Sequence, residues 1–176
     1  VSDAVNIPVS VKMSPYFSSP GNMALQLLDA GASGLVLFNR FLQPDVNPET
    51  LGLDSAFDLS TSHEGRLPRT WIAALRNHTT ASLAGSTGVE TADDVIRYLL
   101  AGADIVMSTA ALVRHGRAYT AELVGGLQSW MVRKGFTSLE QVRGMMALPP
   151  VTDADAIERG GYVAAIQAAK ERYGAL

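Results

Sequence analysis

The chain has 176 residues, enough for one domain with a buried core, and its 47% hydrophobic and 18% charged residues are typical of a globular protein. A formal charge of −3 gives no basic surface for nucleic acid or an anionic membrane, and no apolar run is long enough to span a bilayer. The absence of cysteine excludes disulfides, thiolate metal sites and a cysteine nucleophile within these residues, and we expect a cytoplasmic location.

The chain opens without an initiator methionine or a signal-peptide pattern. Residues 1–5 are interpreted as the end of a helix already under way, which indicates that the chain is a fragment of a longer protein. A loop then leads into residues 9–13, a short β-branched run typical of a strand. Lys12 stands near the carboxyl end of this predicted strand.

A helix and a second strand follow. The apolar positions of residues 22–30 predict a helix that is closed by Gly31. Residues 34–38 then predict a buried strand, which ends at Asn39 and Arg40. These segments make the first complete unit of strand, helix and strand.

The segment from 41 to 67 is long and interrupted by Pro44 and Pro48. In a compact α/β domain such a loop is typical of a functional segment or a lid. Residues 57–60 are interpreted as a short extra strand within it. A helix over 68–77 returns the chain to the main domain.

Residues 81–112 predict two further units. A buried strand over 81–84 ends in a turn of small residues at 85–88, and a short buried strand over 105–107 ends in a similar turn at 108–111. Turns of small residues let backbone N–H groups approach an anion. Because the two strands are predicted to be parallel, both turns fall on one sheet edge, where together they can bind a phosphate.

The helix between these strands has clear end signals. Thr91 is its predicted N-cap, Asp94 follows three residues later, and Gly102 ends it. The expected buried face consists of Val95, Ile96, Leu99 and Leu100. A weak repeat relates residues 27–32 to 99–103, and the repeated unit is a helix, a glycine turn and a parallel strand.

Helices alone are predicted at the C-terminal end. One covers about 117–134 and stops at Gly135, a short one begins at Ser138, and a last one runs from about 153 to 169. With no sign of a domain boundary, residues 1–176 are interpreted as one domain of class α/β, with four parallel β/α units and extra C-terminal helices. A parallel barrel needs eight units and typically about 250 residues, so the chain is half of a barrel or an open sheet.

Short motifs that recur in order along the chain carry a family resemblance. They occupy residues 9–17, 38–40, 86–91, 101–104 and 108–110. In this order and at these spacings they resemble the dihydroorotate dehydrogenases, most of all the soluble FMN-dependent branch and its dihydroorotate-dehydrogenase-like relatives. The resemblance covers nearly the whole chain and implies the C-terminal half, strands five to eight, of that family's TIM-type (β/α)8 barrel.

The resemblance assigns roles at the ring end of the flavin. Lys12 matches a lysine that hydrogen-bonds the flavin near N1 and O2, where a cation stabilises the reduced ring. Asn39 matches the first residue of an Asn-Ser pair that binds the substrate. Arg40 replaces the serine of that pair, which puts a pyrimidine substrate in question. Arg40 is expected to pair with a nearby carboxylate.

The resemblance also places the FMN phosphate. Thr87 and Gly88 match a Gly-Gly pair, and Ser108 and Thr109 match a Gly-Thr pair, whose backbone N–H groups bind the phosphate. Thr87 and Ser108 replace glycines, a change that keeps the backbone donors provided φ stays negative there.

The implied activity is FMN-dependent oxidation of dihydroorotate to orotate, a step of pyrimidine biosynthesis, or of a related small molecule. Flavin N5 accepts a hydride while a base removes a proton. The family's base, a serine or cysteine, lies on a loop that would precede Val1, so no catalytic residue is assigned and this chain alone is not expected to turn over. Residues 57–69 depart from the family's glycine-rich loop, which indicates another substrate. The acceptor, whether fumarate, NAD or a quinone, stays open.

Two other readings stay open. The chain could be a non-catalytic half-barrel that forms a homo-oligomer or pairs with a missing N-terminal half, because its end strands would expose unpaired backbone groups. It could also be a phosphate-sugar barrel enzyme of the indole-glycerol-phosphate type, although residues 12–16 match the dehydrogenase better. The three histidines lack metal-ligand spacing, and no nucleophile-elbow pattern supports acyl transfer.

Overall fold

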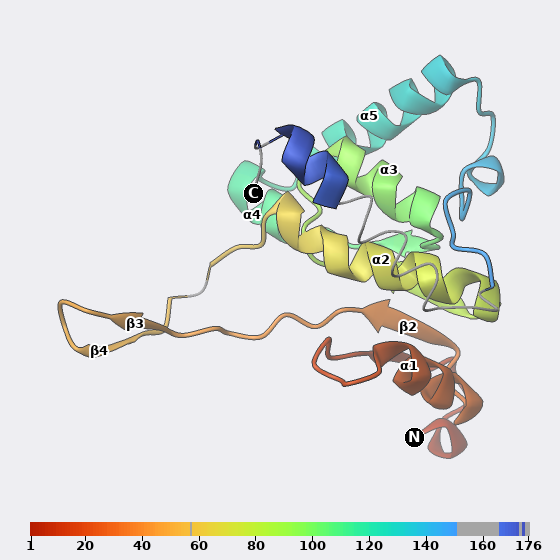
Figure 1. Cartoon of the computed structure of the whole chain (residues 1–176). Helices are drawn as coiled ribbons and strands as arrows, with labels where there is room; N and C mark the ends of the chain where they lie inside the picture. Colours follow the sequence, from red (N-terminus) through yellow and green to blue (C-terminus); the bar gives the residue numbers. More distant parts are fainter. Residues whose placement is uncertain (57, 151–165, 173, 175–176) are drawn as a thin grey trace.

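The computed structural model describes residues 1–56, 58–150, 166–172 and 174. Its main feature is a four-stranded sheet in which all neighbouring strands run parallel (Figure 1). The strands lie in the order β1 (Ser10–Lys12), β2 (Gly34–Leu37), β5 (Ser82–Gly85) and β6 (Ile105–Val106). This is also their order along the chain, as consecutive β/α units produce it, so the predicted parallel α/β class is confirmed.

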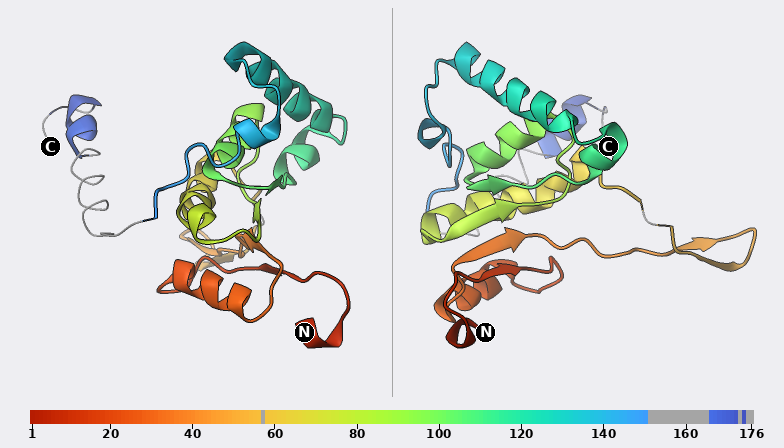
Figure 2. Two further views of the ribbon diagram at one scale, coloured as in Figure 1. Left: turned by 90° about the vertical axis from the view of Figure 1, so that its right-hand side faces the viewer. Right: turned by 180° about the vertical axis from the view of Figure 1, so that it is seen from behind.

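Helices accompany the sheet in the same order, since α1 contacts α2, α2 contacts α3, and α3 contacts α5. These helices are α1 (Pro20–Asp29), α2 (Arg66–Leu75), α3 (Ala92–Ala101), the short α4 (Ala110–His115) and α5 (Tyr119–Lys134). Short 3-10 segments are η1 (Ser2–Ala4), η2 (Ser62–Gly65), η3 (Arg76–His78) and η4 (Leu139–Gln141). Figure 2 shows the helices from two further sides. No helix within the described ranges has both the length and the apolar character needed to cross a bilayer.

The ends of α3 form as the sequence predicts. The Asp94 amide donates to the Thr91 hydroxyl at 3.4 Å, and the Thr91 amide donates to the Asp94 carboxylate at 3.1 Å, which completes a capping box. Gly102 ends the helix with φ 116°, and Gly31 follows α1 with φ 100°, values that favour glycine. The repeated unit of helix, glycine turn and parallel strand is therefore present in both places.

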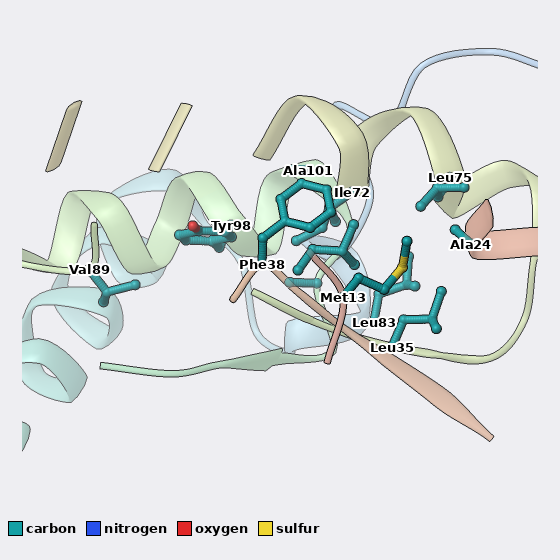
Figure 3. Close-up of a cluster of buried hydrophobic side chains, with 12 residues drawn as sticks. Met13, Ala24, Leu35, Phe38, Ile72, Leu75, Leu83, Val89, Tyr98 and Ala101 are labelled. Carbon is teal, nitrogen blue, oxygen red and sulfur yellow. The ribbon is translucent and has the colours of Figure 1, made fainter. Parts of the chain in front are cut away.

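The core lies between the sheet and the helices (Figure 3). Leu35 and Leu83 of the central strands and Ile72 of α2 are fully buried there. Other members of the same cluster are Met13, Ala24, Leu37, Phe38, Leu75, Val89, Tyr98, Ala101 and Ala103. The two central strands are thus held from the helix side, and their carboxyl ends are fixed relative to one another.

The expectation that residues 105–107 form a buried strand is wrong in one respect. β6 does pair with β5, but Ile105 is 55% exposed and Met107 is 42% exposed. No described residue covers the apolar side chains of Ile105 and Met107 at this edge of the sheet. β1 is the other edge of the sheet, so neither edge has a neighbouring strand among the described residues.

The extra strand predicted over 57–60 is also wrong. Residues 58–60 are in no strand, and Phe57 lies outside the described residues. Instead β3 (Asp45–Asn47) and β4 (Gly52–Asp54) form an antiparallel hairpin, which projects away from the body of the molecule (Figure 1). The Asn47 side chain accepts from the amides of Glu49 and Thr50, which closes the turn.

The chain ends differ from expectation as well. Residues 2–4 form a 3-10 turn, where the end of a helix was predicted. The short helix at Ser138 is the 3-10 segment η4, with a capping box between Ser138 and Gln141. Most of the helix predicted over 153–169 falls outside the described residues.

Candidate functional site

The carboxyl ends of the four strands lie in register at one edge of the sheet. Lys12 is paired with Val36, Leu37 with Gly85, and Gly85 with Val106. The ladder continues one residue further, since the amides of Asn39, Ser86 and Met107 donate to Met13, Leu37 and Gly85 at 2.7, 2.8 and 2.8 Å. The residues just after each strand are therefore held side by side, which is where parallel α/β proteins bind ligands.

An open cleft follows this edge, with ≈ 690 Å³ of empty space that includes open solvent. It brings together five of the six predicted site residues: Lys12, Asn39, Thr87, Gly88 and Thr109. The remaining lining residues are Arg40, Leu59, Ser60, Ser86, Val89, Met107 and Ala110. Ring-end and phosphate-end residues predicted from separate motifs thus share one cleft.

Ser108 is the predicted site residue that the cleft leaves out. Its hydroxyl donates to the carbonyl oxygen of Val89 at 2.9 Å, and it lines another cavity between β6, α3 and α5. The side chain therefore ties the turn at 108–111 to the turn at 85–88. Ser108 could serve a phosphate through its backbone amide alone.

Lys12 and Asn39 reach the cleft with their polar groups available. Among the described residues neither side chain has a hydrogen-bond or ion-pair partner, and Lys12 is exposed. A cation and an amide that are positioned by strand ends but unpaired within the chain are suited to bind a polar ligand. Their use by a flavin or a substrate stays a prediction.

The turn at 85–88 has an unusual backbone. Thr87 has φ 81° and Gly88 has φ 67°. The expectation that φ is negative at Thr87 is therefore wrong. Glycine adopts this positive-φ conformation without strain, whereas it costs other residues about 1–2 kcal/mol. The backbone of Thr87 thus has a glycine-like conformation.

We expect Thr87→Gly to raise the free energy of unfolding by about 1 kcal/mol, because relief of the positive φ exceeds the entropy that glycine adds to the unfolded chain. Chemical denaturation of the full-length protein would measure the change. Thr109→Gly is the matched control, since Thr109 has φ −125° and gains no such relief. Equal destabilisation by both substitutions would contradict the assignment of strain to Thr87.

Tyr98 holds the same turn from beneath, a role that sequence reasoning missed. Its ring is fully buried and its hydroxyl lies 2.9 and 2.7 Å from the carbonyl oxygens of Ser86 and Thr87, to which it donates. Burial raises the pKa of Tyr98, so the hydroxyl keeps its proton and remains a donor. A Cβ at Gly85 would lie 2.2 Å from the Tyr98 ring, so glycine is required there.

Asp94 anchors the segment that covers the turn. Its side chain is fully buried and accepts from the Ser62 hydroxyl at 2.6 Å, while Arg69 and Arg97 lie at 3.3 and 3.2 Å. Burial works against the charged form, but the hydrogen bonds from Ser62, Thr91 and the Glu90 amide outweigh it and lower the pKa of Asp94. The capping residue predicted from sequence thus also links η2 and α2 to the first turn of α3.

A second cavity continues from the cleft across Asn39, Arg40 and Thr87. Aromatic and apolar side chains line much of it: Tyr16, Phe38, Phe41, Leu67 and Pro68. Arg40 pairs with Glu64 at 2.8 Å, which confirms that it contacts a carboxylate. His63 also lines this cavity, whereas His115 lies 2.9 Å from Glu90. Within the described residues no group of His, Asp and Glu is placed to bind a metal ion.

A parallel sheet with helices alongside it and a cleft at its strand ends defines the chain as an α/β protein. No protein-family profile matches it. The chain is 31% identical over 140 residues to dihydroorotate dehydrogenase A (fumarate) of Lactiplantibacillus plantarum, covering 78% of this chain and 46% of that protein. It is 25% identical over 149 residues to the catalytic subunit of dihydroorotate dehydrogenase B (NAD(+)) of Methanothermobacter thermautotrophicus, covering 82% and 49%.

The fold agrees with these relatives. The solved structure of Eimeria tenella DHODH in complex with ferulenol matches 80% of this chain and 38% of its own, with a TM-score of 0.64 and 20% identity. These sequence relatives and the fold support a dihydroorotate dehydrogenase-like family for the chain. It spans about half the length of the curated relatives it matches.

Proposed function

We propose that the chain is the C-terminal half, strands five to eight, of a (β/α)8 barrel that binds FMN and oxidises a small molecule. One observation carries the proposal: Lys12, Asn39, Thr87, Gly88 and Thr109 line a single cleft at the carboxyl edge of the sheet. The four strands in chain order and the match to about half of each relative support the half-barrel.

The described residues fit a flavin phosphate at one end of the cleft. The turn at 85–88 carries no bulky side chain. The Tyr98 hydroxyl hydrogen-bonds the carbonyl oxygens of Ser86 and Thr87 in this turn, which would otherwise repel an anion. Gly88 donates to the Ser60 hydroxyl at 3.3 Å, a long bond whose partner can rotate. The backbone amides of this turn and of Thr109 would hold the phosphate.

The ring end of the site would depend on Lys12. When bound, FMN supplies a two-electron acceptor whose reduced form carries negative charge near N1 and O2. The Lys12 ammonium, which has no partner within the described ranges, would stabilise that charge. Asn39 lines both the cleft and the second cavity, so it would orient a substrate that occupies this cavity.

The proposed substrate is dihydroorotate or a related small molecule. Arg40 stands where a small hydroxyl residue would serve a pyrimidine, and its guanidinium is engaged by Glu64 and by the carbonyl of Asp58. The lining of the second cavity by Tyr16, Phe38 and Phe41 favours a small, partly apolar molecule. The acceptor and the cytoplasmic location stay predictions.

Flavin binding is the direct test. We expect the purified full-length protein to be yellow, with absorbance near 450 nm, and to release FMN on denaturation. Chromatography of the released cofactor would identify FMN. A colourless protein that takes up no added FMN would contradict the proposal.

A second candidate is a half-barrel that is complete only when paired with another sheet. The exposed side chains of Ile105 and Met107 and the two open sheet edges favour it, because a covering sheet would bury all of them. Intact mass and size-exclusion mass of the natural protein separate the cases. A longer chain that is monomeric supports the single barrel, whereas a tight dimer of short chains supports pairing.

A further inference from the structure

We propose that Arg114 is a positioning residue for the phosphate end of the cleft, where it holds the strap, residues 58–61, against the turn at 85–88. This inference rests on the proposed FMN site and deepens it. The strap contributes Leu59 and Ser60 to the lining of the cleft, whereas Arg114 itself lies outside that lining.

The guanidinium of Arg114 joins three parts of the chain that are distant in sequence. Its Nη2 donates to the carbonyl oxygens of Leu59 and Ser60 at 3.1 and 3.0 Å, and its Nη1 donates to the carboxylate of Glu90. Arg114 belongs to α4, and Glu90 follows the turn at 85–88. A single side chain therefore fixes the strap relative to both turns.

These contacts act on the groups that a phosphate would meet. Two strap carbonyl oxygens, which would repel an anion in the cleft, are bonded to a cation that does not line it. The strap also contacts residues 85–88 directly. The Ser60 hydroxyl accepts from the Gly88 amide at 3.3 Å, and a Cβ at Gly88 would lie 2.7 Å from the Thr61 carbonyl oxygen.

Arg114 is suited to this task in a way that lysine is not. The planar fork of guanidinium can bond two neighbouring carbonyl oxygens and a carboxylate at once, whereas an ammonium cannot span the same geometry. Because Glu90 neutralises Arg114, its effect on a bound phosphate would come from placement of the strap more than from long-range charge.

The test compares FMN with riboflavin, which lacks the phosphate, on the apo form of the full-length protein. Wild type should bind FMN more tightly than riboflavin. Arg114→Ala should weaken FMN binding about tenfold and leave riboflavin binding unchanged, because only the phosphate end is disturbed. The FMN affinity of Arg114→Lys should lie between those of wild type and Arg114→Ala. Arg117 is an exposed arginine nearby in the sequence, and Arg117→Ala should bind FMN as tightly as wild type.

Each outcome decides the matter. If Arg114→Ala keeps the wild-type ratio of FMN to riboflavin affinity, the positioning role is wrong even though the FMN site stands. Equal loss for both ligands, with a lowered melting temperature of the apo protein, would show a merely structural role and also overturn it. A wild-type protein that binds neither flavin would refute the proposed function itself. If Arg114→Ala does not fold, the ratio measured on Arg114→Lys decides.

Discussion

Lys12→Ala in the full-length protein is expected to shift the two-electron potential of the bound flavin about 60 mV more negative. The reason is loss of the only cation that β1 brings to the ring end of the cleft, with an effect of about 100-fold on the reduction equilibrium. Equilibration of the flavin with a reference dye during reduction would measure the potential, and this measurement does not require the natural substrate.

Lys134→Ala is the matched control for this experiment. Lys134 is an exposed lysine in the last turn of α5, and it is not among the residues that line the cleft. Its removal should leave the flavin potential unchanged. If Lys12→Ala binds FMN with an unaltered potential, Lys12 does not face the flavin N1 and O2 positions, and its assignment must be abandoned.

Asp94→Asn is expected to lower the free energy of unfolding by about 3 kcal/mol. Asp94 is fully buried, and its two oxygens accept from Ser62, from backbone amides and from two arginines. An amide has one acceptor oxygen, and its NH2 group would face donors, so buried partners would be left unpaired. Urea denaturation at neutral pH would measure the loss.

The same variant makes a pH prediction. Because the pKa of Asp94 is lowered in the folded state, its stabilising effect is full above the unfolded-state value of about 4 and is lost as the pH falls through the folded-state value. The stability gap between wild type and Asp94→Asn should therefore narrow in acid. Asp93→Asn is the control and should show no such narrowing, since the Asp93 side chain is 71% exposed and lies 3.8 Å from Arg97. A constant gap down to acid pH would contradict the role of the charge.

The parts of the fold that follow from local signals could be predicted from sequence. Thr91 and Gly102 mark the ends of α3, and the short apolar runs that end at Lys12 and Asn39 predict parallel strands with polar groups at one edge. These signals depend on residues a few positions apart. Such signals are enough to predict that polar residues and small-residue turns lie together at one edge of the sheet.

The rest depends on contacts between residues far apart in sequence. Arg114 reaches Ser60 across 54 positions, and Asp94 reaches Ser62 across 32. Nothing local in the sequence shows that the Tyr98 hydroxyl meets two carbonyl oxygens. Nor does the sequence show whether another strand covers Ile105, which made a buried strand the natural expectation.

The glycine at position 88 has a consequence for how sequences of this kind can vary. A Cβ there would lie 2.4 Å from the Gly65 amide nitrogen, and a Cβ at Gly65 would lie 2.8 Å from the Arg69 guanidinium that holds Asp94. Backbone atoms cannot move aside as a side chain can, so a side chain at position 88 would separate α2 from the turn, whereas one at position 65 would push the Arg69 guanidinium away from Asp94. Positions 65, 69, 88 and 94 are therefore expected to be inherited as a set, with substitutions among them strongly non-additive.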